Sequence, residues 1–315
     1  MNIKRNIPLK NLTTFRVGGP ANYFCKVKST GDLKKAINFS RQNNLVVFVL
    51  GGGSNILISD SGFDGLVIKI ELKGILYENT FVRVGAGESW DDFIKSAIDM
   101  KLYGIENLSF IPGTVGGAIS GNIGAYGMEV KDKIQWVEVF DIKTSNIIIL
   151  KKSQCKFAYR DSIFKKPEGK NYIITKVCFK LTYNGKSNLS YKDVKEYFKR
   201  KNNTTPTIGE VRKAIGSIRK GKFPNLNKFG TAGSFFKNPV TRGNKIYLAG
   251  LLDGLGMKGL KKGNVGLYEN QPLVFINYGS ASAKEIKNLS EKIINIIKKE
   301  TKIKIIPEVI FVGNF

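Results

Sequence analysis

The sequence predicts a fold of mixed helices and strands in at least two parts, and three observations support this prediction. Residues 12–55 follow the order strand, helix, strand and glycine turn. A second glycine-rich stretch covers residues 111–127. The chain of 315 residues is long enough for two or three domains, and its composition changes at residues 184–187, where Asn-Gly-Lys-Ser marks a hinge.

The stretch at residues 111–127, Ile-Pro-Gly-Thr-Val-Gly-Gly-Ala-Ile-Ser-Gly-Asn-Ile-Gly-Ala-Tyr-Gly, contains six glycines in 17 residues. Glycine loses more backbone freedom on folding than any other residue, so this concentration indicates positive φ angles or close contacts. Successive backbone N–H groups in such a loop can line a concave anion site. We interpret the stretch as a loop that lies against the pyrophosphate of a nucleotide. The alternative is a surface loop with tight turns.

The first elements in chain order are a helix over residues 32–43 and a strand over residues 45–50. The strand is apolar throughout, which is typical of a strand buried in a parallel sheet. The Gly-Gly-Gly-Ser-Asn turn that follows is not a G-x-G-x-x-G fingerprint. The third glycine would fall at Ile56, and no helical pattern follows it.

Further strands and one helix complete the first half of the chain. The helix is expected over residues 90–101, with Ser89 as its N-cap and its apolar positions in the core. Strands are expected at residues 66–70, 81–84, 134–141, 147–150 and 172–183.

The second half is expected to contain four helices and one strand. Thr207 and Glu210 match a capping box that opens a helix ending near Arg219. A second glycine-bounded polar loop covers residues 230–239. The other expected elements are helices over residues 191–201, 248–255 and 283–299 and a strand over residues 304–312. Glu308 would lie inside this strand, where a glutamate needs a partner or a function.

The histidine and cysteine content excludes several kinds of chemistry. The chain has no histidine, which excludes Ser-His-Asp and Cys-His catalysis, His-ligated metals and a histidyl link to a cofactor. Its three cysteines, Cys25, Cys155 and Cys178, are far apart and form no C-x-x-C pair. We therefore expect buried apolar residues rather than disulfides or a metal site.

The net charge of +26 has two interpretations. It could indicate a nucleic-acid-binding protein. However, the basic residues are spread along the chain, mostly as lysines, which favours a solvated surface. The electrostatic field of such a positively charged surface would still attract polyanionic small molecules.

The N-terminus lacks the apolar segment of a secretory signal, and no apolar run approaches the ~18 residues of a membrane span. The sequence therefore predicts a cytoplasmic protein.

Arg160 lies in the segment Phe-Ala-Tyr-Arg-Asp-Ser at residues 157–162, between an aromatic residue and an acid. Two interpretations stay open from the sequence pattern. Arg160 forms a structural ion pair with Asp161, or it acts in catalysis.

Six segments, in this order, resemble those of the UDP-N-acetylenolpyruvoylglucosamine reductases, flavoenzymes of bacterial cell-wall precursor synthesis. Three of them resemble FAD loops: Gly-Gly-Gly-Ser-Asn at 51–55, Ile-Pro-Gly-Thr-Val-Gly-Gly-Ala at 111–118 and Asn-Ile-Gly-Ala-Tyr-Gly at 122–127. Three resemble active-site segments: Tyr-Arg-Asp-Ser at 159–162, Ala-Gly-Ser-Phe-Phe-Lys-Asn-Pro at 232–239 and Pro-Glu-Val at 307–309. The resemblance extends from Thr14 to Val312.

The resemblance implies an α+β fold with a two-lobed FAD-binding domain like that of vanillyl-alcohol oxidase and a C-terminal α+β substrate-binding domain. The FAD-binding domain would cover residues 14–183, with lobes of 14–71 and 72–183. The connecting helices and the substrate domain would cover residues 184–315. The long spacer between Arg160 and Ser234 agrees with the first of the family's two types.

The resemblance also implies an activity. NADPH would reduce noncovalently bound FAD, and enolpyruvyl-UDP-N-acetylglucosamine would then be reduced to UDP-N-acetylmuramate. The hydride would add to the methylene carbon and a proton to the neighbouring carbon. The expected partners are these small molecules, with no nucleic acid, membrane or metal, and the expected state is a monomer.

Site residues follow from the matched motifs. Ser234 corresponds to the family's proton donor, and Arg160 and Glu308 correspond to the pair that polarises the substrate carboxylate. A guanidinium can bind a carboxylate with two parallel hydrogen bonds. The residues matched to FAD binding are Gly51, Gly52, Gly53, Ser54, Asn55, Pro112, Gly113, Thr114, Gly117, Asn122, Gly124 and Ala125. The residues matched to substrate binding are Tyr191, Arg219, Lys222, Asn238 and Gln271.

The chain departs from the family pattern in residues 240–247, which are shorter than the segment that often carries a further substrate tyrosine and lysine. Lys245 or Tyr247 could take that role. Tyr191 could instead pack at a helix start, and Lys222 could be a surface residue.

Two other hypotheses remain beside the reductase. One is a different flavin oxidase or dehydrogenase on the same fold, which would produce peroxide from oxygen. The other is a nucleic-acid-binding protein, which would show salt-sensitive binding to DNA or RNA.

Overall fold

The computed structural model describes residues 1–241 and 243–315. The chain folds into two compact units, each built from separate stretches of the sequence. Unit 1 comprises Met1–Asn2, Cys25–Gly52 and Ile68–Arg219, and unit 2 comprises Ile3–Phe24, Gly53–Val67 and Lys220–Phe315. The domain boundaries expected at residues 71 and 183 stay a prediction from the sequence.

A four-stranded sheet has the order β1 (Ile3–Pro8), β2 (Pro20–Val27), β5 (Phe63–Ile70) and β3 (Val47–Leu50). The chain of β2 and of β5 passes from one unit into the other. Helix α1 (Thr30–Gln42) precedes β3, and the Ser29 side chain caps it by accepting from the Asp32 amide. β3 is an edge strand in which only Leu50 is buried, so the prediction of a buried strand at residues 45–50 is wrong.

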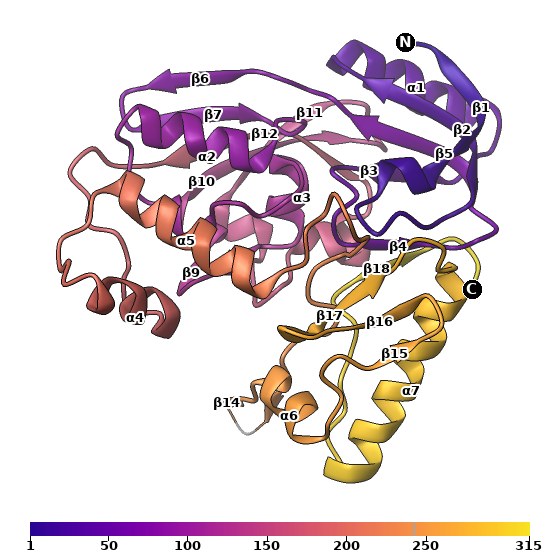
Figure 1. Cartoon of the computed structure of the whole chain (residues 1–315). Helices are drawn as coiled ribbons and strands as arrows, with labels where there is room; N and C mark the ends of the chain where they lie inside the picture. The colour runs from indigo at the N-terminus through magenta and orange to yellow at the C-terminus, as the bar shows by residue number, and fades with distance from the viewer. Residues whose placement is uncertain (242) are drawn as a thin grey trace. The chain divides into compact units, whose positions relative to one another are not determined.

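Unit 1 contains a five-stranded antiparallel sheet in the order β11 (Ile147–Lys151), β10 (Ile134–Asp141), β12 (Tyr172–Lys180), β7 (Phe81–Gly85) and β6 (Ile75–Glu78) (Figure 1). Helix α2 (Trp90–Asp99) packs on it. The rings of Trp90 and Phe93 lie 6.1 and 4.9 Å from the ring of Phe179 in β12. Ser89 accepts from the Asp92 amide, which confirms the predicted N-cap.

The other elements of unit 1 are short or helical. They are the short helix α3 (Val115–Ser120), the hairpin of β8 (Gly124–Ala125) and β9 (Met128–Glu129), and the 3₁₀ turns at Glu106–Leu108, Val130–Lys133, Lys152–Cys155, Ile163–Lys165 and Pro167–Gly169. Helices α4 (Lys192–Arg200) and α5 (Ile208–Lys222) end the unit, and α5 continues into unit 2. The capping box is confirmed: the Thr207 amide donates to Glu210 Oε2 at 2.7 Å, and the Glu210 amide donates to Thr207 Oγ1 at 3.3 Å.

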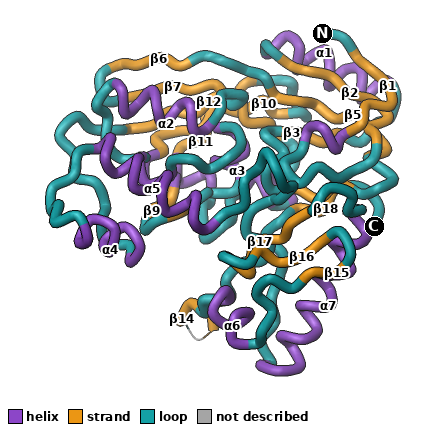
Figure 2. The backbone as a smooth tube through the Cα atoms, in the orientation of Figure 1, coloured by secondary structure: helices purple, strands orange, loops and turns teal. Residues whose placement is uncertain are grey.

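In unit 2, a three-stranded antiparallel sheet lies beside a long helix (Figure 1). The strands are β15 (Lys261–Lys262), β16 (Val265–Tyr268) and β17 (Gln271–Asn277), and the helices are α6 (Leu248–Gly254) and α7 (Ala283–Thr301). The core contains Phe235, Phe236 and Phe275 together with Ile286, Leu289, Ile293 and Ile297 of α7. In Figure 2, much of this unit is drawn in teal, as loop. The remaining short elements are the 3₁₀ turn Leu9–Leu12, β13 (Val240–Thr241) and β14 (Asn244–Lys245).

The last strand is shorter than predicted. β18 (Ile310–Val312) pairs in parallel with β4 (Ile56–Ile58), and residues 304–309 are not strand. Glu308 therefore lies in a bend before β18, and the prediction that it lies inside a strand is wrong. Pro307 forms an isolated antiparallel bridge with Phe236, at a position where the flanking amides of Lys237 and Glu308 donate the hydrogen bonds and no N–H of residue 307 is needed.

All three cysteines are buried, as predicted. Burial raises the pKa of Cys25 to about 11 and that of Cys155 to about 12. Within residues 1–241 and 243–315, none of the helices has the length and apolar character that crossing a membrane requires.

Candidate active site

In unit 1 the glycine-rich stretch forms a loop, a short helix and a hairpin. Gly113 has φ +127° and Gly127 has φ +80°, so two glycines occupy conformations that residues with a Cβ rarely adopt. Thr114 occupies the N-cap position of α3, but its side chain makes no capping bond. Its Oγ1 atom is buried without a hydrogen-bond partner among the described residues. A buried hydroxyl in this state is costly, which indicates a ligand or water beside it.

Gly51 and Gly52 lie directly against this stretch. A Cβ on Gly52 would fall 2.4 Å from the Cα of Gly113, and a Cβ on Gly51 would fall 2.8 Å from Thr114 Oγ1. Only glycine allows these two backbones to approach so closely. The predicted FAD loops of unit 1 are therefore brought together, with an unsatisfied hydroxyl at their contact.

A Gly52→Ala substitution should weaken FAD binding. The added methyl group meets backbone, which cannot move aside as a side chain can, and such overpacking costs about 1–3 kcal/mol. We expect the dissociation constant for FAD to rise at least about tenfold. Flavin titration of the apoprotein measures the change. Gly209→Ala is the matched control, because a Cβ there meets nothing within 4 Å. Equal affinities of the two variants would contradict the prediction.

Lys69 was not predicted from the sequence, yet its amine donates a hydrogen bond to the carbonyl of Gly51. The side chain is half-buried in β5, and burial lowers the pKa of its amine. The available signal was a lysine inside the apolar run Leu66–Ile70. Lys69 adds a positive charge beside the glycine turn.

Asn122 and Gly124 contact neighbouring segments of unit 1. The fully buried amide of Asn122 donates to Glu129 Oε2 at 3.0 Å and to the carbonyl of Ala158 at 2.8 Å, and it accepts from the Lys131 amide at 3.2 Å. These contacts use the side chain within the protein. Gly124, like Ala125, is half-buried in β8. A ligand would meet the backbone of this segment rather than the Asn122 side chain.

Arg160 lies at the tip of a tight turn. Two backbone hydrogen bonds between Ala158 and Asp161, at 3.0 and 3.1 Å, close the turn. Arg160 has φ +53°, an uncommon conformation that is found at functional sites more often than elsewhere. Its Nη2 donates to the carbonyl of Gly124 at 2.6 Å. The Asp161 carboxylate lies 3.6 Å from Lys166. The turn thus holds the guanidinium against the predicted FAD hairpin.

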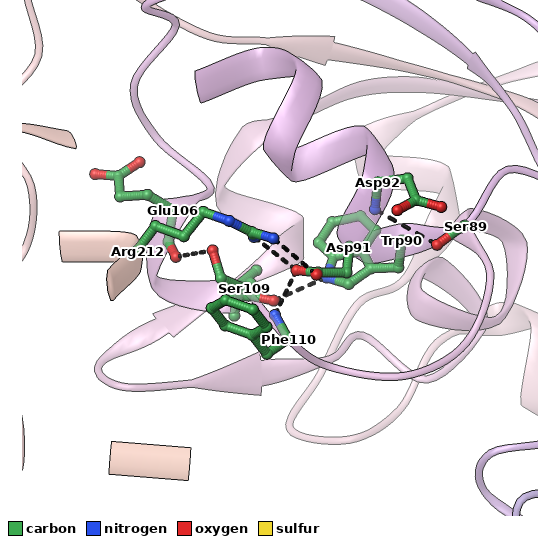
Figure 3. A network of polar contacts seen from close by, with 9 residues as sticks. Ser89, Trp90, Asp91, Asp92, Glu106, Ser109, Phe110 and Arg212 are labelled. Carbon is green, nitrogen blue, oxygen red and sulfur yellow. Dashed lines mark hydrogen bonds and ion pairs between the residues drawn. The ribbon is translucent and has the colours of Figure 1, made fainter. Parts of the chain in front are cut away.

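A network of charged and aromatic groups holds Phe110, the residue immediately before the glycine stretch (Figure 3). Arg212 of α5 donates to both carboxylate oxygens of Asp91, at 2.7 and 2.8 Å. The same carboxylate accepts from the Phe110 amide at 2.5 Å. The Arg212 guanidinium lies 4.2 Å from the centroid of the Phe110 ring. Sequence patterns did not reveal this network because its members are far apart in the chain.

Tyr191 and Arg219 both contact Tyr126, at the end of the glycine stretch. The rings of Tyr191 and Tyr126 meet edge to face with centroids 5.4 Å apart. The Arg219 guanidinium is hydrogen bonded to the Tyr126 hydroxyl. Burial raises the pKa of Tyr126 to about 12, so it stays a neutral hydroxyl, and burial lowers the pKa of Arg219.

In unit 2, backbone pairing joins the segments that carry Ser234 and Glu308. The Glu308 amide donates to the carbonyl of Phe235 at 2.7 Å, and Ser234 forms a bridge with Val274 of β17. Phe235 and Phe236 are buried, while Ser234 is half-buried. Their burial fixes the position of the Ser234 backbone. Arg160, the third residue predicted to be catalytic, belongs to the other unit, unit 1.

The predicted residues Gly53–Asn55 belong to unit 2. A Cβ on Gly53 would fall 2.1 Å from the carbonyl oxygen of Leu12, so this glycine is required for packing. Asn55 Nδ2 donates to the carbonyl of Glu308 at 3.3 Å, and the Ile310 amide donates to the carbonyl of Asn55. The predicted cofactor turn is therefore hydrogen bonded to a predicted catalytic segment.

The remaining substrate candidates differ in their surroundings. Asn238 Oδ1 accepts from the Leu248 amide at 2.9 Å, at the start of α6. Gln271 Oε1 is buried and has no hydrogen-bond partner among the described residues, as expected of a group that meets a ligand. Lys222, the last residue of α5, is half-buried. In the shortened segment at residues 240–247, Tyr247 is 71% exposed, and position 242 lies outside the described residues.

Comparison with known proteins agrees with this geometry. A family model described as an FAD-binding domain matches residues 21–150. A second model, described as the C-terminal domain of UDP-N-acetylenolpyruvoylglucosamine reductase, matches residues 224–312. Together with the paired glycine loops, the matches define an FAD-dependent oxidoreductase and confirm the predicted α+β fold with a separate C-terminal domain.

Curated relatives identify the family. A UDP-N-acetylenolpyruvoylglucosamine reductase of Flavobacterium johnsoniae is 37% identical, with 98% of this chain and 99% of the relative covered. The enzyme of the same name from Amoebophilus asiaticus is 36% identical with the same coverage. The crystal structure of such a reductase from Thermus caldophilus superposes with a TM-score of 0.77 and 27% identity, over 99% of this chain and 100% of that one. The chain belongs to the UDP-N-acetylenolpyruvoylglucosamine reductase family.

Proposed function

We propose that this protein reduces enolpyruvyl-UDP-N-acetylglucosamine to UDP-N-acetylmuramate in peptidoglycan precursor synthesis, with NADPH as the reductant and noncovalent FAD as the cofactor. The observation that carries the proposal is family membership along 98% of the chain. Ser234 and Glu308, on paired backbone segments, support the same chemistry. We propose a cytoplasmic monomer.

The loops of unit 1 would hold the cofactor. Backbone N–H groups near Gly52 and Gly113 and the unsatisfied hydroxyl of Thr114 fit a phosphate-bearing ligand. The positive charge of Lys69 lies beside the same turn. FAD, when bound, would accept a hydride from the reductant and donate one to the substrate.

The protein's own residues would bind the substrate and move a proton. The substrate gains a hydride at its methylene carbon and a proton at the neighbouring carbon, while NADPH becomes NADP⁺. Ser234 would donate that proton from its hydroxyl and recover one from solvent. Arg160 would bind the substrate carboxylate with two hydrogen bonds and stabilise the negative charge that develops there. Glu308 would have to be protonated, or bridged by water or a cation, to face the same carboxylate.

Absorbance spectroscopy of the purified protein tests the proposal. We expect a yellow protein whose flavin absorbance bleaches with NADPH and recovers when enolpyruvyl-UDP-N-acetylglucosamine is added. Steady NADPH oxidation should require that substrate. Rapid oxidation without it, with production of peroxide, would instead indicate a flavin oxidase.

A further inference from the structure

We propose that helix α5 holds both ends of the glycine stretch at residues 111–127, and that Asp91 and Arg212 are positioning residues for cofactor binding. This inference rests on the proposed function, because it assigns FAD to that stretch. Asp91 and Arg212 have neither a cofactor nor a substrate role above. Arg219, which the resemblance matches to substrate binding, enters here only through its contact with Tyr126. All the contacts that carry it lie within unit 1.

The first end of the stretch is held through the backbone of Phe110, the residue immediately before it. Asp91 has three hydrogen-bond donors around its carboxylate: two from Arg212 and one from the Phe110 amide (Figure 3). The side chain of Arg212 is 14% exposed and that of Asp91 is 27% exposed. A two-pronged pair of this kind fixes orientation better than a single surface ion pair does.

The conformation of Phe110 needs this support. Its φ is +61°, which costs about 1–2 kcal/mol for a residue with a side chain. The Arg212 guanidinium covers one part of its ring at 4.2 Å. Gly216 makes room for the ring against α5, because a Cβ on Gly216 would lie 2.8 Å from Phe110 Cε2. Both the backbone and the ring of Phe110 are therefore held by groups that α5 supplies or orients.

The other end of the stretch is held through Tyr126. The Arg219 guanidinium is hydrogen bonded to its hydroxyl, and its ring packs in a cluster with Val211, Ala214 and Ile215 of α5. Arg212, Gly216 and Arg219 are spaced four and three residues apart. In a helix this spacing places them on one face. One face of α5 thus contacts the residue before the glycine stretch and the tyrosine near its end.

This arrangement predicts that loosening α5 weakens FAD binding without removing any atom that touches FAD. The chain between the two held ends contains Gly113 and Gly117, which supply little stiffness of their own. If Phe110 is released, the loop must be ordered when the cofactor binds, and the cost of that ordering lowers the affinity.

Flavin titration of the full-length apoprotein tests the inference with Arg212→Met, which keeps the length of the side chain and removes its charge. We expect the FAD dissociation constant to rise about tenfold, equivalent to about 1.4 kcal/mol. The matched control is Arg83→Met, which breaks an arginine–carboxylate pair of 2.6 Å with Glu78 in the same unit. The control should change the constant by less than about twofold, as expected of an exposed pair.

Two substitutions of Asp91 separate the parts of the network. Asp91→Leu removes the acceptor of the Phe110 amide as well as the ion pair, whereas Asp91→Asn keeps an oxygen that can accept from that amide. We expect Asp91→Leu to weaken FAD binding more than Asp91→Asn. The double variant Asp91→Asn/Arg212→Met should bind FAD no more weakly than Arg212→Met alone, because the two side chains act as one unit.

Hydrogen exchange provides a readout that does not depend on FAD. In the apoprotein, the backbone amides of residues 111 and 113–117 should exchange faster in Arg212→Met than in wild type or in Arg83→Met. If wild type fails to bind FAD, the proposed function fails, and exchange alone still decides whether α5 orders the loop. The inference is overturned if Arg212→Met lowers thermal stability while both FAD affinity and loop exchange stay as in wild type. If Arg212→Met does not fold, Arg212→Lys is judged by the same criteria, since it keeps the charge and loses the two-pronged geometry.

Discussion

Replacement of Ser234 by alanine should leave reduction of the flavin by NADPH intact and reduce turnover of enolpyruvyl-UDP-N-acetylglucosamine about 10²–10⁴-fold. The reason is that the hydroxyl is proposed to supply a proton only in the second half of the reaction. The backbone at Ser234 is fixed by buried neighbours and by its bridge to Val274, so loss of the hydroxyl should not move the loop.

Stopped-flow absorbance of the two half-reactions measures this difference. Ser61→Ala is a suitable control, because it removes an exposed serine hydroxyl from the same unit. Equal loss in both half-reactions would reject the role of Ser234 as proton donor and would indicate a disturbed flavin site instead.

Replacement of Arg160 by methionine should reduce kcat/KM for the same substrate about 10²–10³-fold, or about 2.7–4 kcal/mol of transition-state stabilisation. The guanidinium is proposed to bind a carboxylate whose negative charge grows as the hydride arrives. Arg160→Lys should recover only part of this loss, because an ammonium group cannot form the two parallel hydrogen bonds.

The measurement must separate this role from a structural one, since Arg160 also donates to the carbonyl of Gly124. Steady-state kinetics should therefore be accompanied by FAD titration of each variant. Loss of FAD affinity in parallel with turnover would assign Arg160 to the support of the hairpin. Unchanged affinity with reduced turnover is the result we expect.

Local patterns in the sequence predicted local structure well. The N-cap at Ser89 and the capping box of Thr207 and Glu210 are made by residues three apart, so no distant contact is needed to form them. Helix α7 was predicted over residues 283–299 and forms over Ala283–Thr301. Its apolar spacing marks the face that packs in the core of unit 2.

Predictions that depend on tertiary contacts were less successful. The apolar run at residues 45–50 forms an edge strand over Val47–Leu50. The prediction of a buried strand failed because the composition of a strand does not say which neighbours pair with it. Glu308 lies outside β18, because pairing with β4 begins only at Ile310. Lys69 carried a visible signal, a charge within an apolar run, but its partner is a carbonyl 18 residues away in the chain.

The sequence by itself determined the family, the fold class, the glycine loops and the segments that carry Ser234 and Glu308. Motifs of this kind persist because glycine conformations and side-chain chemistry depend on residue type at fixed spacing. Only the tertiary structure decided that Gly52 touches the backbone of Gly113, that the hydroxyl of Thr114 is left unsatisfied and that Arg212 holds Asp91 and Phe110. The hydrogen bonds of Asp91 join residues that are 19 and 121 positions apart in the chain, and such pairings arise from the packing of whole elements rather than from any local pattern.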